Sequence, residues 1–232
     1  MLAYASFRWR RRIDARLVHA TGGTLHDVET VDAVGRPIIA QFGFLGNKHT
    51  SCTAVVELAS ASGLERVSPA DRNALVASTF GTGLLIRAAI DAGADCIVLG
   101  LGGSATTDGG TGLARALGFH FLDTAGHDIP LGGGSLVDLS RIDDSEVPDF
   151  VKNVPIVLAC DVTNPLTGPE GAAHVFAPQK GATATQVELL DQGLRISRAQ
   201  SCNITAAISS TLRERALREV PEVACLACST QQ

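Results

Sequence analysis

The chain has 232 residues, 45% of them hydrophobic, with 24 glycines and a formal net charge of −5. This length suffices for one large domain or two small ones with a hydrophobic core. The acidic balance argues against a general nucleic-acid-binding surface, and no apolar run approaches the roughly 20 residues that cross a bilayer. We therefore expect neither a nucleic acid nor a membrane among its partners.

The first third of the chain predicts an antiparallel hairpin, a third strand and a helix. Residues 24–33 and 38–45 have the composition of strands, and the turn-forming segment 34–37 (Val-Gly-Arg-Pro) lies between them. Residues 53–58 are expected to form a short strand. Apolar residues at helical spacing predict a helix over 83–92, which ends where a glycine follows.

The middle of the chain alternates strand patterns with helix patterns. Residues 96–101 and 155–160 are continuous apolar runs, as expected of strands that are buried on both faces. Between them, 111–117 predicts a helix and 119–122 a strand, and 183–194 predicts a later amphipathic helix. This order predicts an α/β fold with a parallel or mixed sheet flanked by helices, together with the N-terminal antiparallel hairpin.

The six cysteines are scattered along the chain. Cys96 and Cys160 lie inside apolar strand patterns, so we interpret them as small core residues of a protein in the reducing cytoplasm. Cys225 and Cys228 form a lone CxxC without a second pair, which is weak support for a metal site.

A glycine-rich loop over residues 100–112 is the first candidate site. It joins a predicted buried strand to a predicted helix, which is where ligands bind in open α/β sheets. Glycines let backbone N–H groups approach a phosphate, and the N-terminus of a helix adds partial positive charge. The spacing leaves two roles open for Asp108, which could hold Mg²⁺ or cap the helix. The residues expected to contact substrate or phosphate are Gly102, Gly103, Ser104, Thr106 and Thr107.

Three further loops are candidates for the same site. Asp161 directly follows a predicted strand, where a carboxylate can accept a proton from a substrate hydroxyl, bind a metal or stabilise a turn. Asn164 and the proline after it begin a turn. Lys180 precedes the last predicted helix and could neutralise a transferring phosphoryl group, although a single loop lysine is usually a solvated charge. The glycine loop at 132–135 either lines the same cleft or simply connects two elements.

Together these stretches resemble the bacterial-type glycerate kinase family. The likeness extends over roughly residues 15–194, and it is specific because all the motifs occur in order. The matching stretches are GLGGSATTDGGTGLARALG (100–118), IPLGGGSL (129–136), IDDSEVP (142–148) and ACDVTNPLTGPEGAAHVFAPQKGAT (159–183), with weaker likeness in ELASASGLERV and STFGTGLLI upstream.

The resemblance implies phosphorylation of D-glycerate by ATP with Mg²⁺, usually at the 2-hydroxyl, by two α/β domains that face a cleft, one of them flavodoxin-like. By motif, Ser104 and Thr106 would lie near substrate or phosphate, and Lys180 near the phosphates. Asp161 and Asp108 are the candidates for the catalytic or Mg²⁺-binding role.

Both ends of the chain depart from the family pattern. The Pro-Asp-Ser-Phe-Lys and Ala-Asp-Gly-Gly-Glu-Gly types of loop that open family members do not precede Thr21, and residues 196–232 contain no glycine. We therefore divide the chain into a non-matching start (1–14), a kinase-like α/β region (15–194) and a non-matching tail (195–232). In this interpretation the chain is an incomplete version of a two-domain kinase.

Three functions are compatible with these observations. The chain could be an active kinase in which the missing parts are dispensable or are replaced, for example in a homodimer. It could be an inactive fragment of a kinase. It could also be a non-catalytic α/β module that binds phosphate or a nucleotide.

Overall fold

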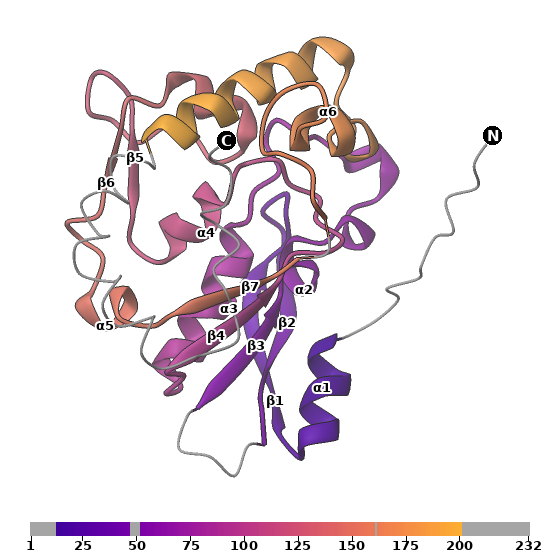
Figure 1. Cartoon of the computed structure of the whole chain (residues 1–232), viewed down its shortest axis with the longest axis vertical. Coiled ribbons are helices and arrows are strands. Elements are labelled where there is room, and N and C mark those ends of the chain that lie inside the picture. The colour runs from indigo at the N-terminus through magenta and orange to yellow at the C-terminus, as the bar shows by residue number, and fades with distance from the viewer. Residues whose placement is uncertain (1–12, 47–51, 161, 201–232) are drawn as a thin grey trace.

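The computed structural model describes residues 13–46, 52–160 and 162–200. Its main feature is a five-stranded sheet with the strand order β1-β2-β3-β4-β7 (Figure 1). A separate two-stranded sheet is made by β5 and β6. The strands are β1 (Thr24–Val31), β2 (Pro37–Phe44), β3 (Thr53–Glu57), β4 (Cys96–Gly100), β5 (His120–Leu122), β6 (Arg141–Asp143) and β7 (Ile156–Ala159).

The helices are mostly short. They are α1 (Ile13–Thr21), α2 (Leu58–Ser62), α3 (Phe80–Asp91), α4 (Thr111–Ala116), α5 (Asp149–Lys152) and α6 (Ala172–Phe176), with single 3₁₀ turns at Leu64–Arg66, Pro69–Asp71, Gly133–Asp138 and Pro178–Lys180. A last helix spans 184–200 and lies at the top of Figure 1, in orange to yellow. In the described part of the chain, no helix is long and apolar enough to span a membrane.

The predicted mixed α/β fold is confirmed. β1 pairs with β2, and β2 with β3, in antiparallel fashion, whereas β3, β4 and β7 run parallel. The predicted hairpin therefore belongs to the main sheet and extends its parallel half. The turn at 34–37 places the two hairpin strands in register, with Val31 opposite Pro37.

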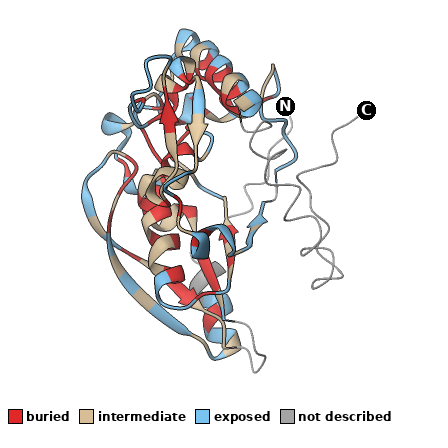
Figure 2. Cartoon of the chain, turned by 90° about the vertical axis from the view of Figure 1, so that its left-hand side faces the viewer, coloured by how far each residue is buried: buried red, intermediate tan, exposed pale blue. Residues whose placement is uncertain are grey.

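Two large hydrophobic cores and a smaller third one hold the described part of the chain together (Figure 2). The first packs α3 and α4 against one face of the main sheet; its members include Val56, Leu85, Ile86, Ile97 and Leu99. Gly83 lets the two helices approach, because a Cβ there would lie 2.4 Å from the carbonyl oxygen of Leu113. The second core joins β5, α6 and the last helix; its members include Phe121, Leu136, Ala173, Leu190 and Leu194.

The strand predicted at 119–122 is present as β5, but it leaves the main sheet and pairs with β6 in antiparallel fashion. The reason is length. The six residues of α4 rise about 9 Å, whereas the five residues of β4 extend about 16 Å. The helix therefore carries the chain only part of the way back, short of the edge where a further parallel strand would begin.

The prediction that residues 155–160 form a strand buried on both faces was wrong. β7 lies at the edge of the sheet, and the side chain of Leu158 is 57% exposed. Cys160 is exposed instead of being a core residue, while Cys96 on the neighbouring strand is half-buried. An apolar run shows that a strand is able to be buried, but the elements packed around the strand decide whether its side chains are buried. In the described residues β7 has a neighbouring strand on one side only.

Candidate functional site

Three parallel strands end at the same edge of the main sheet. Glu57, Gly100 and Ala159 are aligned at the carboxyl ends of β3, β4 and β7. The glycine-rich loop follows β4, and the segment that begins with Cys160 follows β7. The two predicted loops thus leave neighbouring strands, although Asp161 itself lies outside the described residues. This edge is where open α/β sheets bind ligands.

The glycine-rich loop is held on one side and open on the other. Its Gly103 carbonyl accepts a hydrogen bond from the N–H of Leu64, and the Ala105 N–H donates to Ser62. Gly102 and Gly103 are exposed, and a Cβ at Gly102 would meet no atom within 4 Å. The backbone is therefore accessible where a phosphate would need to approach.

Lys180 connects this loop to the motif that follows α6. Its ammonium donates to the hydroxyl of Ser104 at 2.8 Å and to the carbonyl oxygen of Thr106. The side chain is only 6% exposed, and this burial lowers the pKa of Lys180 to about 8, against the opposing influence of the Asp108 charge. Lys180 is thus a buried cation in contact with the loop and not a solvated surface charge.

Asp108 is buried and surrounded by donors. Its Oδ2 accepts hydrogen bonds from the N–H and the hydroxyl of Thr79, both at 2.8 Å, and from the N–H of Gly112 at 3.2 Å. Its Oδ1 accepts from the N–H of Gly110 at 3.3 Å. The carboxylate therefore joins the first turns of α3 and α4, and of the two roles left open the geometry favours the cap.

Thr79 is a site residue that sequence reasoning missed. Its hydroxyl donates to Asp108 and accepts from the N–H of Leu113 at 2.8 Å, so it connects α3 to α4. The available signal was the stretch STFGTGLLI, which matched the family only weakly. Nothing in the local sequence shows that its threonine faces a carboxylate 29 residues later.

The glycine loop at 132–135 contacts the glycine-rich loop. A Cβ at Gly133 would lie 2.4 Å from the carbonyl oxygen of Thr107, so only glycine fits there. The next residue, Gly134, donates its N–H to the carbonyl oxygen of Leu75. This loop therefore packs between the glycine-rich loop and the segment before α3. Thr107 itself is buried, as is Thr106.

Asn164 stays within its own loop in this structure. Its exposed amide donates to the carbonyl oxygen of Glu170 at 3.0 Å, which fits the predicted turn. The loop is anchored by a second residue that sequence reasoning missed: Asp191 on the last helix accepts the N–H of Gly168 at 2.8 Å and pairs with Arg195.

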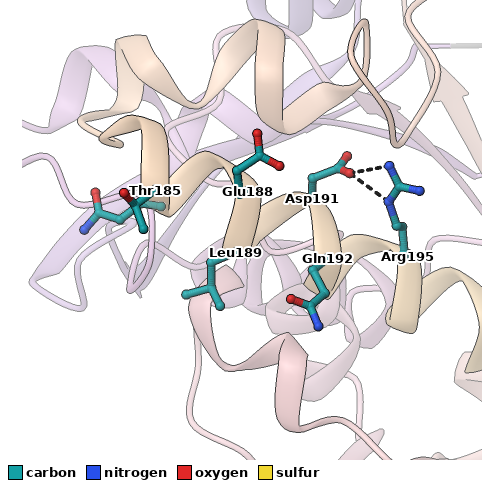
Figure 3. A pocket seen from close by; sticks show the side chains of 7 residues that line it. Thr185, Glu188, Leu189, Asp191, Gln192 and Arg195 are labelled. Carbon is teal, nitrogen blue, oxygen red and sulfur yellow. Dashed lines mark hydrogen bonds and ion pairs between the residues drawn. The ribbon is translucent and has the colours of Figure 1, made fainter.

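The outer face of the last helix has a shallow depression (Figure 3). Its lining comes from this one helix, namely Thr185, Gln186, Glu188, Leu189, Asp191, Gln192 and Arg195. The dashed lines in Figure 3 mark the Asp191–Arg195 pair, which neutralises both charges locally. Side chains of a single helix do not enclose a ligand, so we do not assign a site there.

Comparisons with known proteins show which family this chain is similar to. The sequence profile of the glycerate kinase family matches residues 14–215. A glycerate kinase of Bacillus subtilis (strain 168) is 49% identical over 178 residues, which are 77% of this chain and 46% of that protein. The glycerate 2-kinase of Escherichia coli (strain K12) is 43% identical over the same shares.

A solved structure from Salmonella typhimurium LT2, provisionally assigned as glycerate kinase 2, superposes with a TM-score of 0.76 at 45% identity. The match covers 81% of this chain and 49% of that one. The chain thus spans about half the length of the curated relatives it matches.

Proposed function

The chain belongs to the glycerate kinase family, and from this premise we propose that it binds D-glycerate and contributes to phosphoryl transfer from ATP to a hydroxyl of that acid. One observation carries the proposal: the Lys180 ammonium lies 2.8 Å from the Ser104 hydroxyl, so two separate motifs meet. Phosphoryl transfer depends mainly on positioning and charge stabilisation. This contact places a cation beside a loop with exposed glycine backbone.

We propose roles for five of the predicted residues. The backbone N–H groups of Gly102 and Gly103 would bind phosphate oxygens, and Lys180 would neutralise charge that develops during transfer. Asp108 would act indirectly, by fixing the loop through its helix contacts. Asp161 remains our candidate either for accepting the proton of the substrate hydroxyl or for binding the metal, because in the sequence it comes two residues after the end of β7.

The described residues offer no ready site for Mg²⁺. No group of three or more His, Cys, Asp or Glu side chains among them could hold a metal. Both carboxylate oxygens of Asp108 already accept hydrogen bonds from the protein. In kinases Mg²⁺ is held by one or two carboxylates together with substrate phosphates, and Asp161 is the residue of the predicted set that we propose for it.

The name of one relative supports a proposal for the position of phosphorylation. The Escherichia coli protein is named a glycerate 2-kinase, so we propose that the product is 2-phosphoglycerate. Phosphorus NMR tests this directly, because a 2-phosphate ester couples to one carbon-bound proton and a 3-phosphate ester to two. A triplet in place of a doublet would contradict the assignment.

The proposed activity is tested by coupling ADP release to a colour change in the presence of D-glycerate and ATP. Lys180→Met should lower turnover about a hundredfold or more, because it removes a charge from the transition state. Lys152→Met is the matched control, since Lys152 lies at the surface, paired with Asp144, and this variant should keep wild-type turnover. Equal activity of the two variants would exclude Lys180 from the reaction.

The exposed backbone of Gly102 and Gly103 would equally suit an alternative function, a module that binds ligands without turnover. In that case the wild-type chain would release no ADP above a blank, while D-glycerate or ATP would still raise its melting temperature. The homodimer predicted from the sequence stays a prediction, which sedimentation of the full chain can check.

A further inference from the structure

Two buried side-chain atoms in the described part of the chain have no hydrogen-bond partner: Nε of Arg72 and Oγ1 of Thr107. Buried polar atoms are nearly always paired in folded proteins, so each unpaired atom requires an explanation. Thr107 belongs to the glycine-rich loop, and Arg72 follows the 3₁₀ turn at Pro69–Asp71. Both therefore lie in segments that border the candidate site.

Arg72 packs directly against the loop that carries Lys180. Its Nη1 donates to the carbonyl oxygen of Gln179, at the long distance of 3.3 Å and on the exposed side of the residue. A Cβ at Gly181 would lie 2.7 Å from the carbonyl oxygen of Arg72. The backbone of Arg72 is thus fixed against the loop that carries Lys180, and its Nη1 hydrogen bond lies at the surface.

The charge of Arg72 has no carboxylate within ion-pair distance among the residues that the structure describes. The neighbouring Asp71 pairs instead with Arg36 at 3.2 Å and accepts from the hydroxyl of Ser68. A guanidinium has five N–H donors, and the hydrogen bond to Gln179 uses one of them. An arginine with so few partners is arranged to receive an anion.

We infer that Arg72 binds an oxyanion of the ligand through Nε and an adjacent terminal nitrogen. These two N–H groups are parallel and match the spacing of two oxygens of a carboxylate or a phosphate. An anion bound along the edge formed by Nε and Nη2 would give Nε the acceptor it lacks. The assignment of that anion to D-glycerate or to a phosphate of ATP rests on the proposed function, whereas oxyanion binding by Arg72 does not.

The test is NMR of the full chain labelled with ¹⁵N, following the Nε–Hε signal of Arg72. The signal is assigned by its loss in Arg72→Gln. Separate titrations use D-glycerate, inorganic phosphate and chloride at equal ionic strength. A shift with D-glycerate alone identifies a carboxylate subsite, and a shift with phosphate alone identifies a phosphate subsite. No shift with either, or an equal shift with chloride, would overturn the inference.

Binding affinity provides a second readout. Arg72→Gln should weaken binding of the shifting anion about tenfold or more, because it removes a charge-assisted pair of hydrogen bonds. Arg72→Lys keeps the charge but lacks the two parallel donors, so its affinity for the anion should lie between those of the wild type and of Arg72→Gln. Arg66→Gln removes an exposed arginine nearby and should bind like the wild type. If Arg72→Gln does not fold, the signal is assigned by its loss in Arg72→Lys, and the wild-type titration still decides.

Turnover is measured separately, so the two proposals can fail independently. Anion binding at Arg72 without any ADP release would leave this inference standing and remove the kinase proposal. If Arg72→Gln turns over with unchanged KM and kcat, and the Nε signal of the wild type does not move during the titrations, only the inference about Arg72 is overturned.

Discussion

Lys180 holds a positive charge in the interior, beside the glycine-rich loop. Burial lowers its pKa from the ordinary 10.5 to about 8. The folded chain therefore holds this proton less tightly than the unfolded chain does, and below the lowered pKa the buried ammonium works against folding. A buried charge that opposes folding is expected to have a function. The contacts of the Lys180 ammonium with Ser104 and Thr106 are consistent with this expectation.

The sign of the pH dependence follows from this lowered pKa. The contribution of Lys180 to the free energy of unfolding should become more favourable as pH rises from about 8 toward 10.5, since the folded form loses its proton first. Urea unfolding of the wild type and of Lys180→Met across this range isolates the contribution. The difference between the two proteins should change in favour of the wild type as pH rises. A difference that stays constant would show that Lys180 is not buried in solution.

At the scale of secondary-structure elements, Asp108 joins two helices that the sequence separates. The first turn of α3 donates to it through Thr79, and the first turn of α4 through Gly110 and Gly112. The helix N-termini also place partial positive charge around the carboxylate. The shape of the glycine-rich loop therefore depends on how α3 and α4 are held together.

This arrangement predicts a stability effect for Asp108→Asn. The amide would direct donors of its own at N–H groups, leaving buried donors unpaired, and should lower the free energy of unfolding by about 1–3 kcal/mol. Asp138→Asn changes an exposed aspartate and should have almost no effect in the same urea titration. Full stability of Asp108→Asn combined with loss of turnover would instead support the catalytic or metal-binding role.

Local patterns predicted most elements but not the contacts between them. The hairpin, α3 and the last helix were visible in the sequence because turn residues and apolar spacing act over a few positions. The roles of Asp108 and Lys180 depend on partners 29 and 76 residues away, which no local pattern contains. The last helix also continues to residue 200, beyond the predicted end at Leu194. The apolar spacing predicted its start and its buried face but not this extension.

At the scale of the whole molecule, the parallel half of the sheet is covered unevenly. Leu99 on β4 and Leu158 on β7 are register partners on one face. Leu99 is 3% exposed and belongs to the first core, whereas Leu158 is 57% exposed. Leucine thus has two different environments in the same row of the sheet. Composition cannot distinguish these environments, and for this reason it predicted both strands to be buried.

Alanine substitutions at these two leucines test how far the buried core extends across the sheet. Leu99→Ala should lower the free energy of unfolding by about 2–5 kcal/mol, because it removes buried methyl groups and leaves a cavity. Leu158→Ala should cost less than about 1 kcal/mol, since most of that side chain is already in water. Urea unfolding of both variants gives the comparison within one row of one sheet. Equal losses would mean that another polypeptide segment covers this face of β7 in solution, and the exposure described for Leu158 would then be wrong.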